Sequence, residues 1–122
     1  MLPSVLSELP VSTEQILHPE KYLRHELPDA ITLPDLPALA ALGYEPHDED
    51  TLGELEMSVW LAIGSSGDRD RAAAAGWGGD RLRVYRGPSA TTAAVWWTTW
   101  DDESEAEEAE RAVAIVSSHL FA

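Results

Sequence analysis

The four histidines of the chain are its best candidates for metal binding and proton transfer, and they stand at positions 18, 25, 47 and 119. No two of them are three or four residues apart, and the sequence has no His-Glu-x-x-His motif, the common zinc hydrolase signature. Cysteine is absent, so disulfides are excluded and a zinc site would need histidine and carboxylate ligands alone. We therefore expect no catalytic residue, no bound metal and no cofactor.

Residues 47–50 (His-Asp-Glu-Asp) have a composition that suits a divalent cation. However, adjacent side chains point in different directions, and the run lacks the glycine and the terminal glutamate of an EF-hand loop. Acidic residues ahead of a helix are also favoured by the helix dipole. The run is therefore interpreted as a solvated segment before the next helix rather than as a metal site.

Residues 76–81 (Gly-Trp-Gly-Gly-Asp-Arg) form a glycine-rich loop. The loop lacks the Gly-Lys-Ser/Thr ending of a phosphate loop and precedes a strand, and no Gly-x-Ser-x-Gly nucleophile elbow occurs in the sequence. Its glycines favour a tight turn with positive φ that Asp80 and Arg81 help to fix. A turn that contacts a ligand is the alternative, because binding residues concentrate on loops.

Three tryptophans, Trp96, Trp97 and Trp100, lie within one predicted strand. Trp96 and Trp100 share one face of that strand, and Trp97 lies on the other. The simpler interpretation is that both faces are buried, because tryptophan is usually largely buried. The alternative is that one pair lines a surface for a sugar or a peptide.

The scaffold for these residues is predicted to be a single α+β domain over residues 1–122, built on a small antiparallel sheet. Residues 81–86 alternate in polarity and residues 91–100 are the most strand-like stretch, so the two should pair as a hairpin. Residues 30–33, which lie between two prolines, are a candidate extra strand.

Two helices, at about 51–63 and 103–119, are predicted to pack on this sheet. The first begins with capping-box spacing between Thr51 and Glu54, and its apolar stripe comprises Leu52, Leu55, Val59 and Ala62 or Ile63. The second begins at Asp102, and its stripe comprises Ala106, Ala109, Val113, Val116 and Leu120.

The chain is strongly acidic, with 22 acidic residues, 8 basic ones and a net charge of −14. Such a surface repels nucleic acid and anionic membranes, and no apolar run approaches the ~20 residues that span a bilayer. We therefore expect no nucleic acid and no membrane insertion, while a protein or peptide partner is compatible with the charge. The charge mainly indicates solubility, and attraction of cations or a basic partner is the alternative.

With no signal peptide visible, a complete chain is expected in the cytoplasm; a piece of a larger protein would be compatible with the cell envelope or secretion.

Residues 10–22 (Pro-Val-Ser-Thr-Glu-Gln-Ile-Leu-His-Pro-Glu-Lys-Tyr) resemble the P-x-STEQ-[VI]-LHPEKY segment of bacterial and archaeal zincin-like, zinc-peptidase-related proteins. Residues 50–54 (Asp-Thr-Leu-Gly-Glu) and 74–81 (Ala-Ala-Gly-Trp-Gly-Gly-Asp-Arg) are similar to two further segments of the same proteins. The resemblance implies that larger relatives carry a His-Glu-x-x-His helix upstream of this region. It also implies that this sequence corresponds to their C-terminal lobe without the zinc-binding lobe.

The matched segments predict a polar cluster where residues 12–22 meet residues 76–81. Its predicted members, a binding or structural set, are Glu14, His18, Tyr22, Glu54, Trp77, Asp80 and Arg81. Within it, Glu14 is expected to pair with either Arg81 or Lys21. An internally satisfied, structural cluster is favoured over a substrate or partner surface, because buried polar groups need partners.

The sequence therefore favours a non-catalytic accessory or interaction domain related to the C-terminal lobe of zincin-like proteins. One alternative is a part of a metallopeptidase whose zinc site lies in another segment or in a partner chain. The other is a small-ligand or peptide-binding domain that uses the Trp77 loop and the tryptophan strand.

Overall fold

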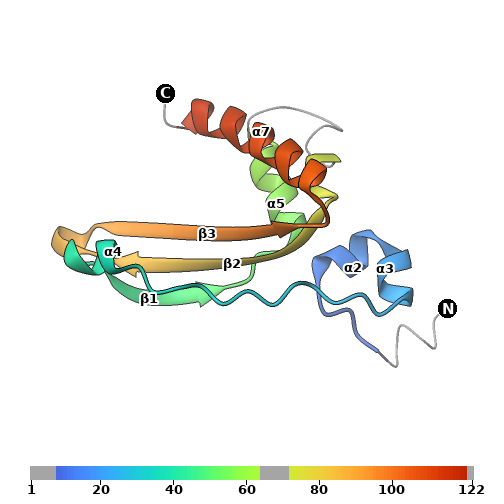
Figure 1. The fold of residues 1–122 in the computed structure, drawn as a ribbon, viewed down its shortest axis with the longest axis horizontal. Helices are drawn as coiled ribbons and strands as arrows, with labels where there is room; N and C mark the ends of the chain where they lie inside the picture. Colours follow the sequence, from blue (N-terminus) through green and yellow to red (C-terminus); the bar gives the residue numbers. More distant parts are fainter. Residues whose placement is uncertain (1–7, 64–71, 121–122) are drawn as a thin grey trace.

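An antiparallel sheet of three strands runs through the computed structural model, which describes residues 8–63 and 72–120. The strands are β1 (Glu45–Asp50), β2 (Trp77–Arg86) and β3 (Thr92–Trp100), and they lie in the order β1-β2-β3 (Figure 1). β2 and β3 pair along their whole length, so the predicted hairpin is confirmed. With the helices around it, this sheet makes the α+β fold that the sequence predicts.

The third strand is not where the sequence places it. Residues 30–33 are extended but form no strand, because the Arg83 guanidinium, and not a neighbouring strand, binds the carbonyls of Leu33 and Pro34. The acidic run interpreted above as a solvated segment instead belongs to β1, which pairs with β2. Glu49 there accepts hydrogen bonds from Nε of Arg81 at 2.7 Å and of Arg83 at 3.0 Å. These cross-strand bonds hold the pKa of Glu49 below its usual value and let an acidic segment pair at the sheet edge.

Residues 77–80 are also part of a strand and not of the predicted turn. They begin β2, with an irregularity in the register between Trp77 and Gly79. A Cβ added to Gly79 would lie only 2.7 Å from the Asp29 carbonyl oxygen, and the Asp29 N–H donates to the Gly78 carbonyl at 2.7 Å. The glycines therefore permit close approach of another backbone segment, and a positive φ is not their role here.

Helices α5 (Glu54–Leu61) and α7 (Glu103–Leu120) pack together at one end of the sheet (Figure 1). The predicted start of the last helix is confirmed, because the Glu105 N–H donates to Oδ1 of Asp102 at 2.9 Å. Its predicted stripe is buried at Ala109 and Val116 and half-buried at Ala106 and Val113; the side chain of Leu120 lies outside the described part. The buried core that α7 helps to form consists of Met57, Leu61, Ala73, Ala74, Trp77 and Val116.

Helix α5 buries a different face from the one that the sequence predicts. Its N-cap is Gly53, at a φ of +97°, and not Thr51. Three residues of the predicted stripe are largely exposed: Leu55 (46%), Val59 (64%) and Ile63 (51%). The buried residues of this helix are Glu54, Met57 and Leu61. An apolar stripe on α5 therefore faces solvent.

The N-terminal part forms two short helices, α2 (Thr13–Leu17) and α3 (Pro19–Leu23), beside α5. From α3 the chain runs along the sheet to α4 (Pro37–Ala41) at its far end, near the short helix η1 (Pro88–Ala90) of the hairpin turn (Figure 1). No helix in the described ranges is long and apolar enough to cross a membrane.

Replacing the core residue Val116 with aspartate should lower the free energy of unfolding by at least about 3 kcal/mol, because a charge would be buried without a partner. Ala114→Asp, on an exposed face of the same helix, should cost less than about 1 kcal/mol through helix propensity. Chemical denaturation of both variants measures the difference. Equal losses would show that the α7 stripe does not contribute to the core.

Candidate functional site

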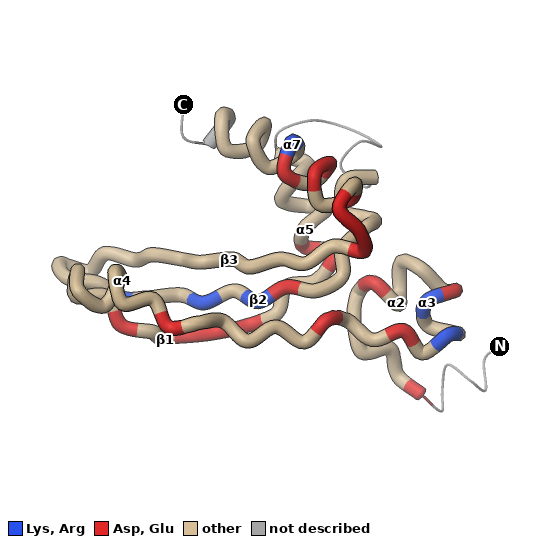
Figure 2. The backbone as a smooth tube through the Cα atoms, in the orientation of Figure 1, with Lys and Arg blue, Asp and Glu red and all other residues tan. Residues whose placement is uncertain are grey.

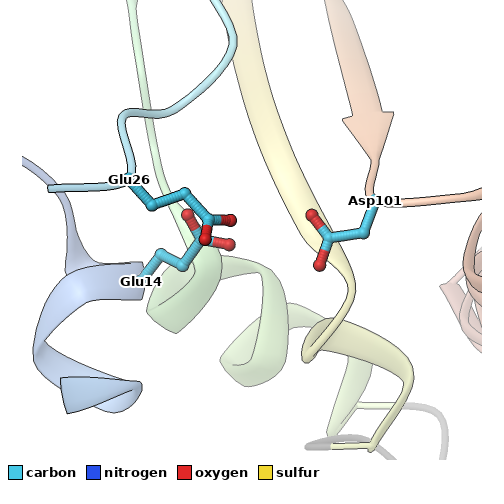
Figure 3. Close-up of side chains that lie close together, drawn as sticks. All are labelled: Glu14, Glu26 and Asp101. Carbon is cyan, nitrogen blue, oxygen red and sulfur yellow. The ribbon is translucent and has the colours of Figure 1, made fainter. Parts of the chain in front are cut away.

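The buried ammonium group of Lys21 lies among three carboxylates. Its Nζ is 2.5 Å from Oε1 of Glu14, 3.0 Å from Oδ2 of Asp101 and 3.5 Å from Oε1 of Glu26. Figure 3 shows Glu14 and Glu26 on one side and Asp101 facing them. One oxygen from each of the three lies within 4.8 Å of the others, a spacing that would suit a metal ion. Here it is Lys21 that binds all three, which makes the group an ion-pair cluster.

This ion-pair cluster fastens the N-terminal segment to the end of β3. Burial alone lowers the pKa of Lys21, but the hydrogen bonds to Glu14 and Asp101 outweigh it and the net pKa is raised. The pKa of Glu14 is also raised, because burial and the charges of Asp101 and Glu26 together outweigh its bond to Lys21. Since three carboxylates share one ammonium group, Lys21 stays charged in the folded protein. Buried charges of this kind persist only when they are paired.

His18 and the buried Glu54 form a second, partly buried polar contact, between α2–α3 and α5. Nε2 of His18 is 2.7 Å from Oε1 of Glu54, and Nδ1 is 3.6 Å from Oε1 of Glu20. Burial raises the pKa of Glu54, although the hydrogen bond to His18 opposes this. Oε2 of Glu54 is buried with no hydrogen-bond partner among the described residues. Both ring nitrogens of His18 therefore face carboxylates.

Asp80 joins the start of α5 to the core. Its Oδ1 accepts the Leu52 N–H at 2.7 Å, and its Oδ2 accepts the Gly53 N–H at 2.7 Å and Nε1–H of Trp77 at 3.0 Å. On the other side of this junction, Oγ1 of Thr13 accepts the Leu55 N–H at 3.2 Å. The segments carrying Glu14, His18 and Asp80 therefore all meet at the first turn of α5.

Two residues of the predicted polar cluster lie elsewhere. Arg81 binds Glu49 of β1 and Thr51, which follows that strand. Oη of Tyr22 donates to the Glu8 carbonyl at 2.6 Å. Of the two predicted partners of Glu14, Lys21 is the one that binds it, and Lys21 is also the centre of the ion-pair cluster. The signal available in the sequence was that Lys21 is the only lysine in a strongly acidic chain.

A separate, largely apolar pocket of about 410 Å³ lies between β3 and helices α5 and α7. Its walls include three tryptophans, Trp60, Trp96 and Trp100, together with Thr98 and Glu110. We call it the tryptophan pocket. The rings of Trp60 and Trp96 are nearly perpendicular, with centroids 5.5 Å apart and an interplanar angle of 76°. As the sequence predicts, Trp96 and Trp100 share a face of the strand.

Two indole groups of the pocket, those of Trp96 and Trp100, differ in their hydrogen bonding. Nε1 of Trp100 donates to Oγ1 of Thr98 at 3.0 Å, whereas Nε1 of Trp96 is buried and has no partner among the described residues. An unpaired buried donor costs roughly 1–3 kcal/mol. The two other strand tryptophans do not line the pocket: Trp77 is fully buried in the core, and Trp97 is 47% exposed.

A family model described as a domain of unknown function, DUF8575, matches residues 41–120 of the chain. The chain belongs to the DUF8575 family. No curated protein and no solved structure matches it. Every residue that lines the tryptophan pocket lies inside the matched span, whereas Glu14, His18 and Lys21 lie before it. The zincin-like resemblance rests largely on residues 10–22, also outside this span, and stays a prediction.

Asp80→Ala should lower the free energy of unfolding of the DUF8575 chain by about 3 kcal/mol, because it leaves three N–H donors without their acceptor. The matched control is Asp50→Ala, which removes an exposed carboxylate next to the same segment and should cost less than about 0.5 kcal/mol. Thermal and urea unfolding measure both losses. A stable Asp80→Ala variant would argue that Asp80 does not fix the start of α5.

The stability of the protein should fall as pH rises through the raised pKa of Glu54. Between the unfolded value of 4.5 and the higher folded value, the folded state binds more protons than the unfolded state, so raising the pH favours unfolding. Glu54→Gln, which mimics the protonated form, should show a smaller loss of melting temperature between acidic and alkaline buffer. Glu56→Gln, an exposed change on the same helix, should keep the full loss. Identical pH profiles for all three proteins would contradict this assignment.

Proposed function

We propose that this DUF8575 chain is a non-catalytic binding domain that holds its ligand in the tryptophan pocket. The observation that carries the proposal is a concave, mostly apolar cavity walled by three tryptophans. Ligand sites have volumes of roughly 300–1,000 Å³ and combine apolar walls with a few polar groups. The pocket meets both criteria, at about 410 Å³ and with Thr98 and Glu110 as its polar side chains. A second hollow near α4 has only about 200 Å³, below that range.

The distribution of polar groups supports binding over catalysis. The carboxylates with raised pKa values, the buried Glu14 and Glu54 and the half-buried Glu105, do not line the pocket. Glu14 and Glu54 bind Lys21 and His18, and through them join segments of the fold. General acid–base catalysis needs a titratable group that faces the substrate, and in the part of the lining that the structure describes the one titratable side chain is the exposed Glu110.

The pocket also contains a buried hydrogen-bond donor without a partner among the described residues, which lowers stability and is a feature common at functional sites. The unpaired indole N–H of Trp96 breaks the rule that buried polar groups are satisfied. Proteins tend to break such local rules where function requires a particular side chain. Trp96 fits this pattern because its ring forms one wall of the cavity.

The exposed apolar stripe of α5 favours an accessory setting for this domain. Leu55, Val59 and Ile63 recur every four residues and face solvent. A stripe of this kind is typical of a helix that packs against a second surface. We therefore also propose that this stripe of α5 packs against a neighbouring lobe or chain, as the zincin-like resemblance implies.

The neutral fluorophore N-phenylnaphthylamine should bind the protein at a single saturable site and alter its tryptophan emission. Ala106→Phe, which places a large ring inside the pocket, should weaken this binding at least about tenfold by occupying the same apolar volume. Ala114→Phe, on the exposed side of the same helix, should bind as the unmodified protein does. Fluorescence titration measures each affinity, and circular dichroism checks folding. Unchanged binding by a folded Ala106→Phe variant would contradict the proposal.

A further inference from the structure

We propose that the tryptophan pocket takes an organic cation, specifically the methylated ammonium group of a ligand or side chain. This inference rests on the proposed function, because it assigns a ligand class to the same pocket. It depends on three properties of the lining: the geometry of the indoles, the sign of the charge beside them and the scarcity of free hydrogen-bonding groups.

The indole walls have the arrangement that stabilises a positive charge. An aromatic ring carries negative charge density on its face, and a cation within about 6 Å of the ring centre is attracted to it. The rings of Trp60 and Trp96 meet at 76°, so they form two walls of a corner and not a flat stack. Trp100, fixed by its bond to Thr98, adds a third indole to the same cavity. Two nearly perpendicular indoles with a third beside the same cavity suit a compact, roughly spherical cation better than a flat ring.

The charge at the pocket is negative and therefore complementary to a cation. Among the described residues of the lining, Glu110 is the one charged side chain, and none is a lysine or an arginine. Glu110 lies on α7, whose N-terminal half is acidic, as Figure 2 shows. The whole chain carries a net charge of −14. A field of this sign raises the local concentration of cations and repels anionic ligands.

The polar inventory argues against a sugar, the other ligand class that stacks on tryptophan. A sugar brings many hydroxyl groups, and each one that is buried without a partner costs free energy. Among the described residues the lining offers few such partners: the Glu110 carboxylate, the Trp96 indole N–H and the Thr98 hydroxyl, which already accepts a hydrogen bond from Trp100. A methylated ammonium group has few or no N–H donors to satisfy. It therefore enters an apolar aromatic cavity without stranding polar groups.

The test compares choline with dimethylbutanol, its uncharged analogue in which carbon replaces the ammonium nitrogen. The two have the same shape, so the difference in their affinities isolates the charge. Isothermal titration of the whole chain should give one choline per protein, bound at least about tenfold more tightly than dimethylbutanol. The emission of the pocket tryptophans should change on choline addition.

Substitutions of two glutamates on α7 test whether the preference for a charged ligand arises at the pocket. Glu110→Gln should weaken choline binding about three- to tenfold and leave dimethylbutanol binding unchanged. Glu107→Gln removes the same charge from an exposed position outside the lining and should leave both affinities close to those of the unmodified protein. Because both side chains are exposed, neither change is expected to impair folding.

The outcomes separate this inference from the proposed function. If dimethylbutanol or methyl glucoside binds as tightly as choline, or choline fails to bind while N-phenylnaphthylamine does, the ligand class is wrong and the pocket remains a binding site. If Glu110→Gln and Glu107→Gln have equal effects, the charge does not act at the pocket and the inference is overturned. If no probe binds, both the inference and the proposed function fail.

Discussion

The carboxylate of Asp80 is the contact on which the arrangement of this domain depends. Its two oxygens bind the backbone just before α5 and the indole of the core residue Trp77 at the same time. Gly53 sits at this junction with a φ of +97°, a conformation that other residues rarely adopt. The direction in which α5 leaves the junction determines that Met57 and Trp60 face the sheet. The tryptophan pocket is thus positioned by a carboxylate that does not line it.

Charged groups and aromatic groups have separate roles in this fold. In the described ranges, Lys21, Arg81 and Arg83 bind carboxylates from different segments and hold those segments together. The tryptophan pocket, by contrast, has almost no polar lining and is formed where two helices cross the end of the hairpin. This separation leaves most of the net negative charge free of compensation at the surface. The acidic surface and the largely apolar aromatic cavity, with Glu110 in its lining, are then both complementary to the cation that we propose as the ligand.

The sequence predicted those elements whose local pattern agrees with their tertiary surroundings. The hairpin and α7 are of this kind, because alternation and the three-four spacing coincide with what is buried. It failed where contacts between distant residues override local preference. Four of the six residues of β1 are acidic, and the strand pairs because Arg81 and Arg83 bind its Glu49. Helix α5 turns an apolar stripe outward because Asp80 and Thr13 fix its start.

The candidate site was predictable to the same extent. The shared face of Trp96 and Trp100 followed from the two-residue period of a strand. The contribution of Trp60 did not follow, because it depends on the rotation of α5. The pairing of Lys21 with Glu14 was one of two predicted alternatives, but its contacts with Glu26 and Asp101 were not predicted, since no local pattern connects positions 14, 26 and 101.

The ion-pair cluster has a consequence for the order in which the chain folds. The contact between Lys21 and Asp101 spans 80 residues, and the one between Asp29 and Thr99 spans 70. Closing loops of this length before other contacts exist costs conformational entropy without an immediate gain. The hairpin, whose partners are close in sequence, can form first and present Asp101 and Thr99 at its end. We therefore expect residues 8–29 to dock late and to be a segment that opens while the sheet stays folded.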